Sequence, residues 1–277
     1  MTATTGAGRP STGTEPVLSM TGINKRFGAV QALTDVSFSV NSGEVVALVG
    51  DNGAGKSTLV KVMSGAGPSD SGQILFEGRP VSIPSPSASQ NLGIATVFQD
   101  LALCDNLDVV GNLFLGSEIT LGGVALDEAE MERRSWELLK TLAAKIPSVR
   151  IPVASLSGGQ RQTVAISRSL LGNPKVVILD EPTAALGVAQ TAQVLNLVER
   201  LRDRGLAVIL ISHNMADVQA VADRVVVLRL GRNAGEFDAR QVSTTELVAA
   251  ITGASDNVVA ERAAREHRTA GSEGTNA

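Results

Sequence analysis

Residues 46–58 constrain this chain more than any other stretch. An apolar run ends at Gly50, four residues follow, and the sequence Gly-Lys-Ser begins at Gly55. This is the spacing of a phosphate-binding loop, and the strand expected before it and the helix expected after it supply the context that the pattern needs. The alternative is a glycine-rich turn between a strand and a helix that binds nothing, but every fixed position of the pattern is filled.

The residue types in this loop suit a nucleotide with Mg²⁺. Glycine has no Cβ, so the backbone can turn sharply and its N–H groups can converge on a phosphate at the positive end of the following helix. Lys56 is placed to bridge the β- and γ-phosphates, and Ser57 offers a hydroxyl to Mg²⁺, which prefers oxygen ligands. The predicted nucleotide-binding residues of the loop are Gly50, Asp51, Asn52, Gly53, Ala54, Gly55, Lys56, Ser57 and Thr58.

Composition narrows the class of protein. The chain has 277 residues, 43% of them apolar, which allows a full core. Its net charge of −4 disfavours a nucleic-acid surface, so no nucleic-acid partner is expected. Cys104 is the one cysteine, so no internal disulfide can form, and we expect it to be a packed small residue. No apolar run reaches the length of a membrane span, about 18 residues, and a role at a membrane would require a partner.

Apolar β-type runs and helical patterns alternate along the chain. Strands are expected at residues 17–20, 36–40, 44–49, 93–98, 176–179, 207–212 and 225–230, and a hairpin with arms at 72–77 and 81–83. Helices are expected at residues 56–64, 127–143, 158–171, 189–203, 215–221 and 245–251. Nearly continuous apolar strands between helices indicate an α/β fold with a mainly parallel sheet that is buried on both faces.

The same patterns suggest how the chain is divided. Residues 100–174 contain no strong strand and are expected to form a helical insertion in the α/β core, with Trp136 packed inside. The expected domain spans residues 17–253. Residues 1–16 and 254–277 are expected to be flexible tails, the second of which could form a short helix at 257–265.

Polar side chains stand at the ends of the expected strands. Asp180 and Glu181 close one strand and point to opposite sides, so Asp180 can bind Mg²⁺ while Glu181 orients or deprotonates the attacking water. Gln99 and His213 each follow another strand, and carboxyl ends of parallel strands meet where ligands bind. Glu181, His213 and Gln99 are the predicted catalytic residues, and Ser57, Gln99 and Asp180 the predicted metal ligands. Taken singly, Gln99 or His213 could equally be a structural hydrogen-bonding group.

A second glycine-rich helix start has the sequence Leu-Ser-Gly-Gly-Gln at residues 156–160. Ser157 is a natural N-cap, and the N-terminus of a helix attracts an anion. If two copies pair head to tail, one nucleotide could lie between this helix start and the phosphate loop of the other copy. Ser157, Gly158, Gly159 and Gln160 are then the residues predicted to bind it in trans. An ordinary capped helix is the alternative for this stretch taken alone.

Phe27 allows two interpretations. It stands between two expected strands, after Lys25 and Arg26 and before Gly28. As an aromatic residue near a strand it could pack in the core, and as a flat apolar ring it could stack on a purine base. The residues themselves leave this choice open.

Taken in order, the motifs resemble the nucleotide-binding subunit of ATP-binding cassette (ABC) transporters. The matching residues are 50–57, 99, 156–160, 176–181 and 213. The resemblance implies a P-loop NTPase (RecA-like) core with a mainly parallel sheet, an N-terminal antiparallel β subdomain and an inserted α-helical subdomain at about residues 100–174. It also implies ATP hydrolysis with Mg²⁺ in a homodimer that encloses two ATP molecules, with Ser157 and Gly159 serving the partner's nucleotide and Phe27 on the adenine.

A finer resemblance points to bacterial importers of monosaccharides of the ribose, xylose and fructose kind, through residues 99–107, 181–187 and 211–215. It implies two transmembrane permease subunits, an extracytoplasmic sugar-binding protein, and a peripheral place on the cytoplasmic face of the bacterial inner membrane. An exporter cassette and an ABC ATPase of a non-transport complex, such as a DNA-repair protein, are the alternatives. Gly187 departs from the family pattern, because most cassettes have an aspartate there that helps couple the two sites.

Overall fold

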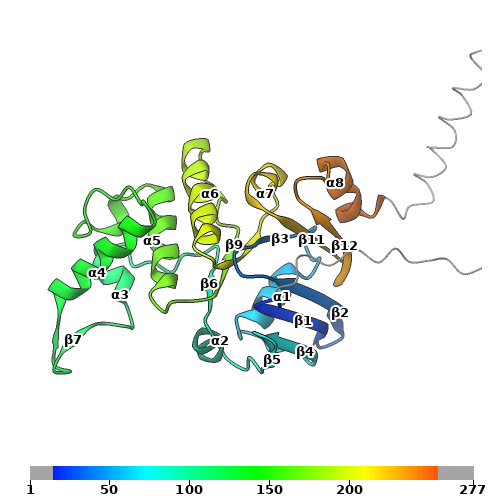
Figure 1. The fold of residues 1–277 in the computed structure, drawn as a ribbon, viewed down its shortest axis with the longest axis horizontal. Coiled ribbons are helices and arrows are strands. Elements are labelled where there is room, and N and C mark those ends of the chain that lie inside the picture. Colours follow the sequence, from blue (N-terminus) through cyan, green and yellow to red (C-terminus); the bar gives the residue numbers. More distant parts are fainter. Residues whose placement is uncertain (1–14, 255–277) are drawn as a thin grey trace, which may run out of the picture.

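The computed structural model describes residues 15–254, which form two larger β-sheets with helices packed around them (Figure 1). The expected tails, residues 1–16 and 254–277, lie almost entirely outside the described residues, and the helix considered at 257–265 lies wholly outside them. Within the described part, no helix is both long and apolar enough to cross a membrane.

The larger sheet has six strands in the order β12-β11-β3-β10-β9-β6. All neighbours from β11 to β6 are parallel, and β12 runs antiparallel at one edge. Its strands are β3 (Val45–Val49), β6 (Ile94–Val97), β9 (Val176–Asp180), β10 (Ala207–Ile211), β11 (Arg224–Arg229) and β12 (Arg232–Asp238). The prediction of a mainly parallel sheet is confirmed.

Both faces of this sheet are buried. Helix α1 (Lys56–Met63) lies on one face, and α6 (Val188–Asp203), α7 (Met215–Val221) and α8 (Thr244–Thr252) cover the other (Figure 1). In β10, Ile209 and Ile211 pack on the α1 side, whereas Val208 and Leu210 pack on the opposite side. Because successive side chains point to opposite faces, a strand buried on both sides needs an apolar residue at every position.

The second sheet is antiparallel, with strands in the order β2-β1-β4-β5. It consists of β1 (Leu18–Phe27), β2 (Val30–Val40), β4 (Ser71–Phe76) and β5 (Arg79–Pro80), and α2 (Pro86–Leu92) follows it. The edge strand β2 lies beside β12, where the Ser37 N–H donates to Oδ1 of Asn233 and Nδ2 of Asn233 donates to the Ser37 carbonyl, both at 2.8 Å. This sheet is the N-terminal antiparallel β subdomain that the family resemblance implies.

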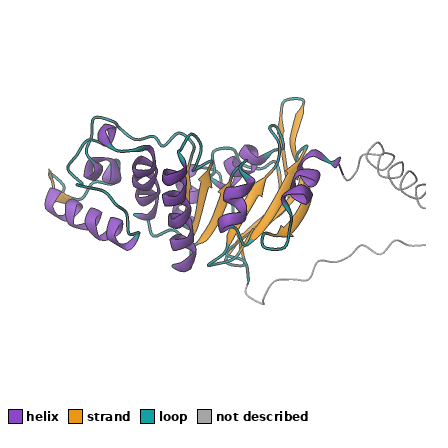
Figure 2. Ribbon diagram, turned by 90° about the horizontal axis from the view of Figure 1, so that it is seen from above, coloured by secondary structure: helices purple, strands orange, loops and turns teal. Residues whose placement is uncertain are grey.

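The chain between β6 and β9 forms a cluster of helices at the left of Figure 1, and Figure 2 shows these helices set beside the sheets. The cluster contains α3 (Val109–Phe114), α4 (Glu128–Thr141), a 3₁₀ turn (Val153–Ser155) and α5 (Gly158–Leu170). A small hairpin of β7 (Thr120–Leu121) and β8 (Ala125–Leu126) projects from it. The insertion is therefore helical as expected, apart from this hairpin.

The strands differ from expectation in several places. β1 continues through residues 25–27, which were expected to lie between strands, and β12 was not predicted because Arg232–Asp238 has no apolar alternation. The second hairpin arm is Arg79–Pro80 instead of residues 81–83. Leu230, expected within a strand, turns with a φ of 48° just after β11.

Trp136 is not in the core, so that expectation is wrong: its exposed fraction is 40%. Helix α4 buries Met131, Ser135 and Leu139, which recur every four residues on one face. Trp136 directly follows Ser135, and one residue turns the side chain by about 100° around a helix. Its position on the helix, and not its size, decides its exposure.

Asn112 is a wholly buried amide that organises the loop leading into the helical cluster. Its Oδ1 accepts from the Cys104 N–H at 2.7 Å. Its Nδ2 donates to the carbonyl oxygens of Cys104, Leu107 and Asp108 at 2.9, 3.2 and 3.0 Å. The Asn112 side chain thus hydrogen-bonds to backbone groups of a loop that is neither helix nor strand. Cys104 lies partly buried in that loop.

Replacing Asn112 by alanine should destabilise the fold, because buried backbone groups lose their partners. We expect the free energy of unfolding, measured by urea denaturation followed by circular dichroism, to fall by about 3 kcal/mol. Asn106→Ala removes an exposed amide from the same loop and should change this free energy by less than about 0.5 kcal/mol. Equal stability of the two variants would show that the buried amide does not hold the loop.

Candidate functional site

The phosphate loop lies between the end of β3 and the start of α1. Gly50 has a φ of 152° and Gly55 a φ of 104°. A Cβ at Gly50 would lie 2.2 Å from the carbonyl oxygen of Leu228, and a Cβ at Gly55 would lie 2.8 Å from the Leu33 side chain. Since real Cβ atoms do not approach so closely, both positions require glycine, and the loop keeps the tight turn that a phosphate group needs.

Lys56 bends back over this loop. Its Nζ donates to the carbonyl oxygens of Gly50 at 2.7 Å and of Asp51 at 3.1 Å. The loop borders an open groove of about 570 Å³, which is lined by residues 30–32, 52–58 and 230–231. An ammonium group at this position can donate hydrogen bonds to the oxygens of a phosphate chain that binds in the groove.

The parallel sheet brings the other predicted site residues to the same edge. Ile211 of β10 is in register with Leu48 of β3 and with Asp180 of β9, and Leu179 is in register with Val97 of β6. The strand ends therefore converge as the sequence predicted. The residues that follow these ends are the phosphate loop, Gln99, Glu181 and His213.

Asp180 presents a partly buried carboxyl group at this edge. Burial raises the pKa of Asp180, the charge of Glu181 raises it further, and the charge of Lys56 lowers it. A divalent cation would offset the cost of keeping this carboxylate charged, and the exposed hydroxyl of Ser57 adds an oxygen donor that suits Mg²⁺. Among the described residues no three His, Cys, Asp or Glu side chains gather as a metal site.

Glu181 and His213 are in direct contact. Nδ1 of His213 lies 2.8 Å from Oε2 of Glu181. The Glu181 side chain is 17% exposed, whereas that of His213 is 73% exposed. The carboxylate is thus sheltered while the imidazole reaches the open edge of the sheet, and Gln99 is exposed just beyond β6.

Ser157 caps helix α5 as the sequence predicted. Its Oγ accepts from the Gln160 N–H at 3.3 Å, and Oε1 of Gln160 accepts from the Ser157 N–H at 2.9 Å. Nε2 of Gln160 also donates to the Lys145 carbonyl at 2.9 Å, so this side chain bonds within its own chain. Ser157 is exposed, whereas Gly159 is buried. No residue of this helix start lines the phosphate-loop groove, so one chain does not bring the two predicted half-sites together.

Phe27 ends strand β1 with a side chain that is 51% exposed. Of its two interpretations, packing in the core is therefore wrong. Phe27 pairs with Val30, which lines the phosphate-loop groove, and the Lys25 ammonium lies 5.5 Å from the centroid of the ring. A half-exposed ring beside this groove can stack on a base, and that role stays a prediction.

Three polar residues near the site, Thr183, Asp217 and Arg168, were not predicted from the sequence. Thr183 donates to Asp217 at 2.7 Å, and Arg168 donates to the carbonyl oxygens of Leu101 and Ala102 at 2.8 Å each. These bonds join residues that are 34, 67 and 66 positions apart. No local pattern signals such pairs, because the fold alone brings them together.

Comparisons with known proteins identify the family. A family model described as ABC transporter matches residues 33–184. The fructose import ATP-binding protein FrcA of Rhizobium meliloti is 44% identical over 249 residues, which cover 87% of this chain and 96% of that protein. The xylose/arabinose import ATP-binding protein XylG of Sulfolobus acidocaldarius is 45% identical over 78% of this chain and 86% of that protein. The ribose import ATP-binding protein RbsA of Yersinia pestis is 43% identical over 86% of this chain but only 46% of its own length.

Solved structures give the same result. A nucleotide-free ATP-binding cassette from an ABC transporter is similar with a TM-score of 0.74 at 29% identity, covering 86% of this chain and 96% of that one. A protein of Clostridium perfringens that is part of an ABC transporter complex gives a TM-score of 0.73 at 28% identity, covering 91% and 100%. The glycine turn under Lys56, the converging strand ends and these matches together show that the chain belongs to the ABC transporter family and is an ATP-binding cassette that hydrolyses ATP with Mg²⁺.

Proposed function

We propose that the chain is the ATP-hydrolysing motor subunit of an ABC importer that takes up a monosaccharide. The observation that carries this proposal is the 44% identity to a fructose import ATP-binding protein over 96% of that protein's length. Relatives named for the import of xylose or arabinose and of ribose point to the same class of solute. The motor works on the cytoplasmic face of a bacterial inner membrane with two permease subunits, which receive the sugar from an extracytoplasmic binding protein.

A complete ATP site in this proposal needs two copies of the chain. Lys56 borders the groove on one side of the molecule, whereas the exposed Ser157 stands at the start of α5, outside that groove. In a head-to-tail homodimer, Ser157 and Gly159 of one copy face the γ-phosphate that Lys56 of the other copy binds. Hydrolysis removes the group that joins the copies, so the dimer opens and the motion passes to the permease.

Glu181 acts as the base that orients and deprotonates the attacking water. Its carboxylate is sheltered and lies 2.8 Å from Nδ1 of His213, which fixes its direction. Because Nδ1 faces Glu181, Nε2 is the ring nitrogen left for the γ-phosphate, and it donates to a phosphate oxygen when both ring nitrogens carry a proton. The two residues thus place the water and the phosphate relative to each other.

The remaining site residues bind the phosphates and the cation. Lys56 exchanges its bonds to the backbone of the phosphate loop for bonds to β- and γ-phosphate oxygens. Ser57, Asp180 and Gln99 would hold Mg²⁺, which when bound supplies positive charge that offsets the charge on the transferring phosphoryl group. The backbone N–H groups of the loop and the start of α1 bind the β-phosphate.

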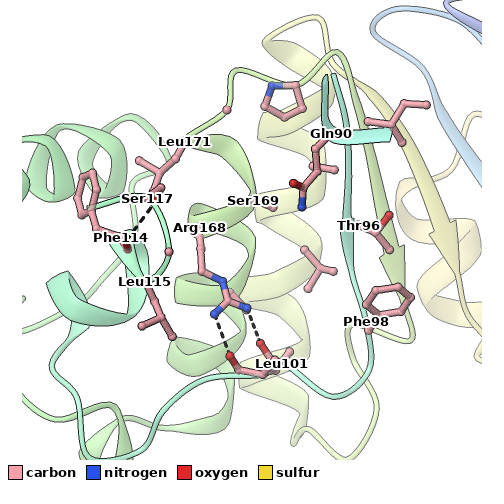
Figure 3. A pocket seen from close by; sticks show the side chains of 18 of the residues that line it. Gln90, Thr96, Phe98, Leu101, Phe114, Leu115, Ser117, Arg168, Ser169 and Leu171 are labelled. Carbon is pink, nitrogen blue, oxygen red and sulfur yellow. Dashed lines mark hydrogen bonds between the residues drawn. The ribbon is translucent and has the colours of Figure 1, made fainter. Parts of the chain in front are cut away.

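A groove between the larger sheet and the helical cluster is the proposed docking site for the permease (Figure 3). It has a volume of about 650 Å³ and is lined by β6, by α5 and, in larger part, by the loops that follow β6, α3 and α5. Phe98 and Leu115 in its lining are 43% and 47% exposed. Apolar side chains that line a hollow are suited to cover an inserted segment of a partner protein.

Arg168 connects this groove to both half-sites. It stands on α5, which begins beside Ser157, and its guanidinium donates to the carbonyl oxygens of Leu101 and Ala102, two and three residues after Gln99 (Figure 3). A movement of α5 or of the loop that follows β6 would therefore shift both Gln99 and Ser157. This supports a coupling of permease motion to closure of the ATP sites.

Gly187 removes one link that most cassettes have between their two sites. It is the N-cap of α6 and gives that helix no side-chain hydrogen bond. An aspartate at this position would supply both a cap and a charge, so the two ATP sites of this homodimer communicate without that carboxylate.

Proteins with the alternative functions contain the same ATP-binding motifs, but the relatives described above are import proteins. An exporter cassette would contain the same phosphate loop and helix start, yet the relatives described above are named for import. A DNA-repair cassette carries a long coiled-coil insertion, whereas the longest helix between β6 and β9 has 14 residues.

Phe27→Ala should weaken ATP binding, because stacking on a base is worth more than 1 kcal/mol. We expect the Kd for MgATP, measured by isothermal titration calorimetry, to rise about tenfold while its Mg²⁺ dependence is unchanged. Trp136→Ala removes another exposed ring, far from the groove, and should leave the Kd unchanged. An unaltered Kd in Phe27→Ala would remove this ring from the nucleotide site.

Glu181→Gln should bind ATP but hydrolyse it at least about a hundredfold more slowly, because the amide cannot accept the proton of the water. With MgATP this variant should accumulate as a dimer in size-exclusion chromatography with light scattering. Lys56→Ala, which cannot hold the γ-phosphate, should stay monomeric under the same conditions. A strictly monomeric Glu181→Gln protein with MgATP would contradict the two-copy site.

The transport proposal is tested by reconstituting this chain in vesicles with the permease that co-purifies with it and a sugar-binding protein, with ATP on the motor side. We expect ATP-dependent accumulation of a labelled monosaccharide, and Leu115→Glu in the docking groove should lower it about tenfold. Val248→Glu places a charge at an exposed apolar site on α8 and should leave uptake unchanged. Efflux without uptake would establish an exporter instead.

A further inference from the structure

The backbone that follows β9 makes a strained turn. Glu181 has a φ of 51° and Ala185 a φ of 59°, both in the left-handed region that residues with a Cβ rarely adopt. Within the turn, the Ala184 N–H donates to the Glu181 carbonyl at 3.1 Å and the Leu186 N–H donates to the Thr183 carbonyl at 3.2 Å. A conformation of this kind persists only where surrounding contacts fix it.

Three polar contacts that hold the turn come from one neighbouring segment, residues 211–217. The Glu181 N–H donates to the Ile211 carbonyl at 3.0 Å, and Nδ1 of His213 lies 2.8 Å from Oε2 of Glu181. A further contact joins side chains, because Oγ1 of Thr183 donates to Oδ2 of Asp217 at 2.7 Å. The turn is thus attached at its start and at its middle to the segment that carries His213.

The direction of the Asp217 side chain is not explained by its own helix. Asp217 is the third residue of α7, where an acidic side chain ordinarily accepts from the backbone at the N-cap. Helix α7 is instead capped by Asn214, whose Oδ1 accepts from the Ala216 N–H, while the Asn214 N–H donates to Oγ of Ser212. Only 6% of Asp217 is exposed, so a buried carboxylate is directed at Thr183.

We propose that Asp217 is a positioning residue for ATP hydrolysis. By accepting a hydrogen bond from the Thr183 hydroxyl, Asp217 fixes the turn that carries Glu181. Because Asp217 also stands four residues after His213, it fixes the position of the Glu181 carboxylate relative to the His213 imidazole. The inference rests on the proposed roles of Glu181 and His213 in hydrolysis. Asp217 itself contacts neither the nucleotide nor the water, so its loss should change the rate of the chemical step and not the affinity for ATP.

The test compares Asp217→Ala, Thr183→Val and Asp217→Asn in the full chain, by steady-state hydrolysis over a range of MgATP concentrations. Asp217→Ala and Thr183→Val should each lower kcat about tenfold or more with KM changed less than about twofold, because a small misplacement of reacting groups is costly. Asp217→Asn keeps an oxygen that can accept from Thr183 and should restore kcat to within about threefold of the parent. The double variant Thr183→Val/Asp217→Ala should be no slower than the slower single variant, because both changes remove the same bond.

A purely structural role would give a different result. Ser135→Ala removes another buried hydroxyl, which donates to the Met131 carbonyl at 2.8 Å on α4, and should lower the Tm without lowering kcat per folded molecule. A normal kcat in Asp217→Ala and Thr183→Val overturns the inference, as does a loss in Asp217→Asn equal to that in Asp217→Ala. If Asp217→Ala does not fold, Thr183→Val decides, because it removes the donor and keeps the volume of the side chain.

Glu181→Gln in the same assay distinguishes the positioning role of Asp217 from the proposed role of Glu181. A slow Glu181→Gln together with a fully active Asp217→Ala overturns the positioning role alone. A fully active Glu181→Gln overturns the proposed role of Glu181, on which the inference rests.

Discussion

The parallel pairing of β3, β10, β9 and β6 is the constraint on which the rest of the molecule depends. These strands are buried on both faces, so a shift of register by one residue would exchange the side chains of the two faces and is strongly disfavoured. A fixed register places the ends of the strands side by side. The phosphate loop, Asp180, Glu181, Gln99 and His213 therefore lie at the same edge of the sheet because of the strand pairing and not because of contacts among their side chains.

Features that follow from local pattern could be predicted from the sequence. Unbroken apolar runs predicted the central strands, since only strands buried on both faces need them, and the glycine spacing predicted the turn under Lys56. Ser157 was recognised as an N-cap because serine is a preferred N-cap residue and stands directly before a helical pattern. The meeting of the strand ends then followed from the parallel sheet, without knowledge of any side-chain contact.

Features that depend on neighbours distant in the chain could not be predicted. Strand β12 is largely polar and is a strand because β11 offers it hydrogen bonds, not because of its own residues. Trp136 was misplaced because the buried face of α4 is set by what α4 packs against. The bond between Thr183 and Asp217 joins residues 34 positions apart. Asn112 bonds to backbone groups of a loop whose conformation cannot be deduced from its residue types.

The bonds between Asn233 and Ser37 have a consequence for how this protein associates. Strands β2 and β12 are the outer strands of their sheets, and each would otherwise present open peptide groups to any passing strand. The side-chain amide of Asn233 hydrogen-bonds to Ser37 as a peptide group of a neighbouring strand would. Together with the bond from the Thr34 N–H to the Gly231 carbonyl at 2.7 Å, it joins the edge strand β2 to the edge strand β12. Along this border the protein is thereby protected from the unselective strand pairing that leads β-sheet proteins to aggregate.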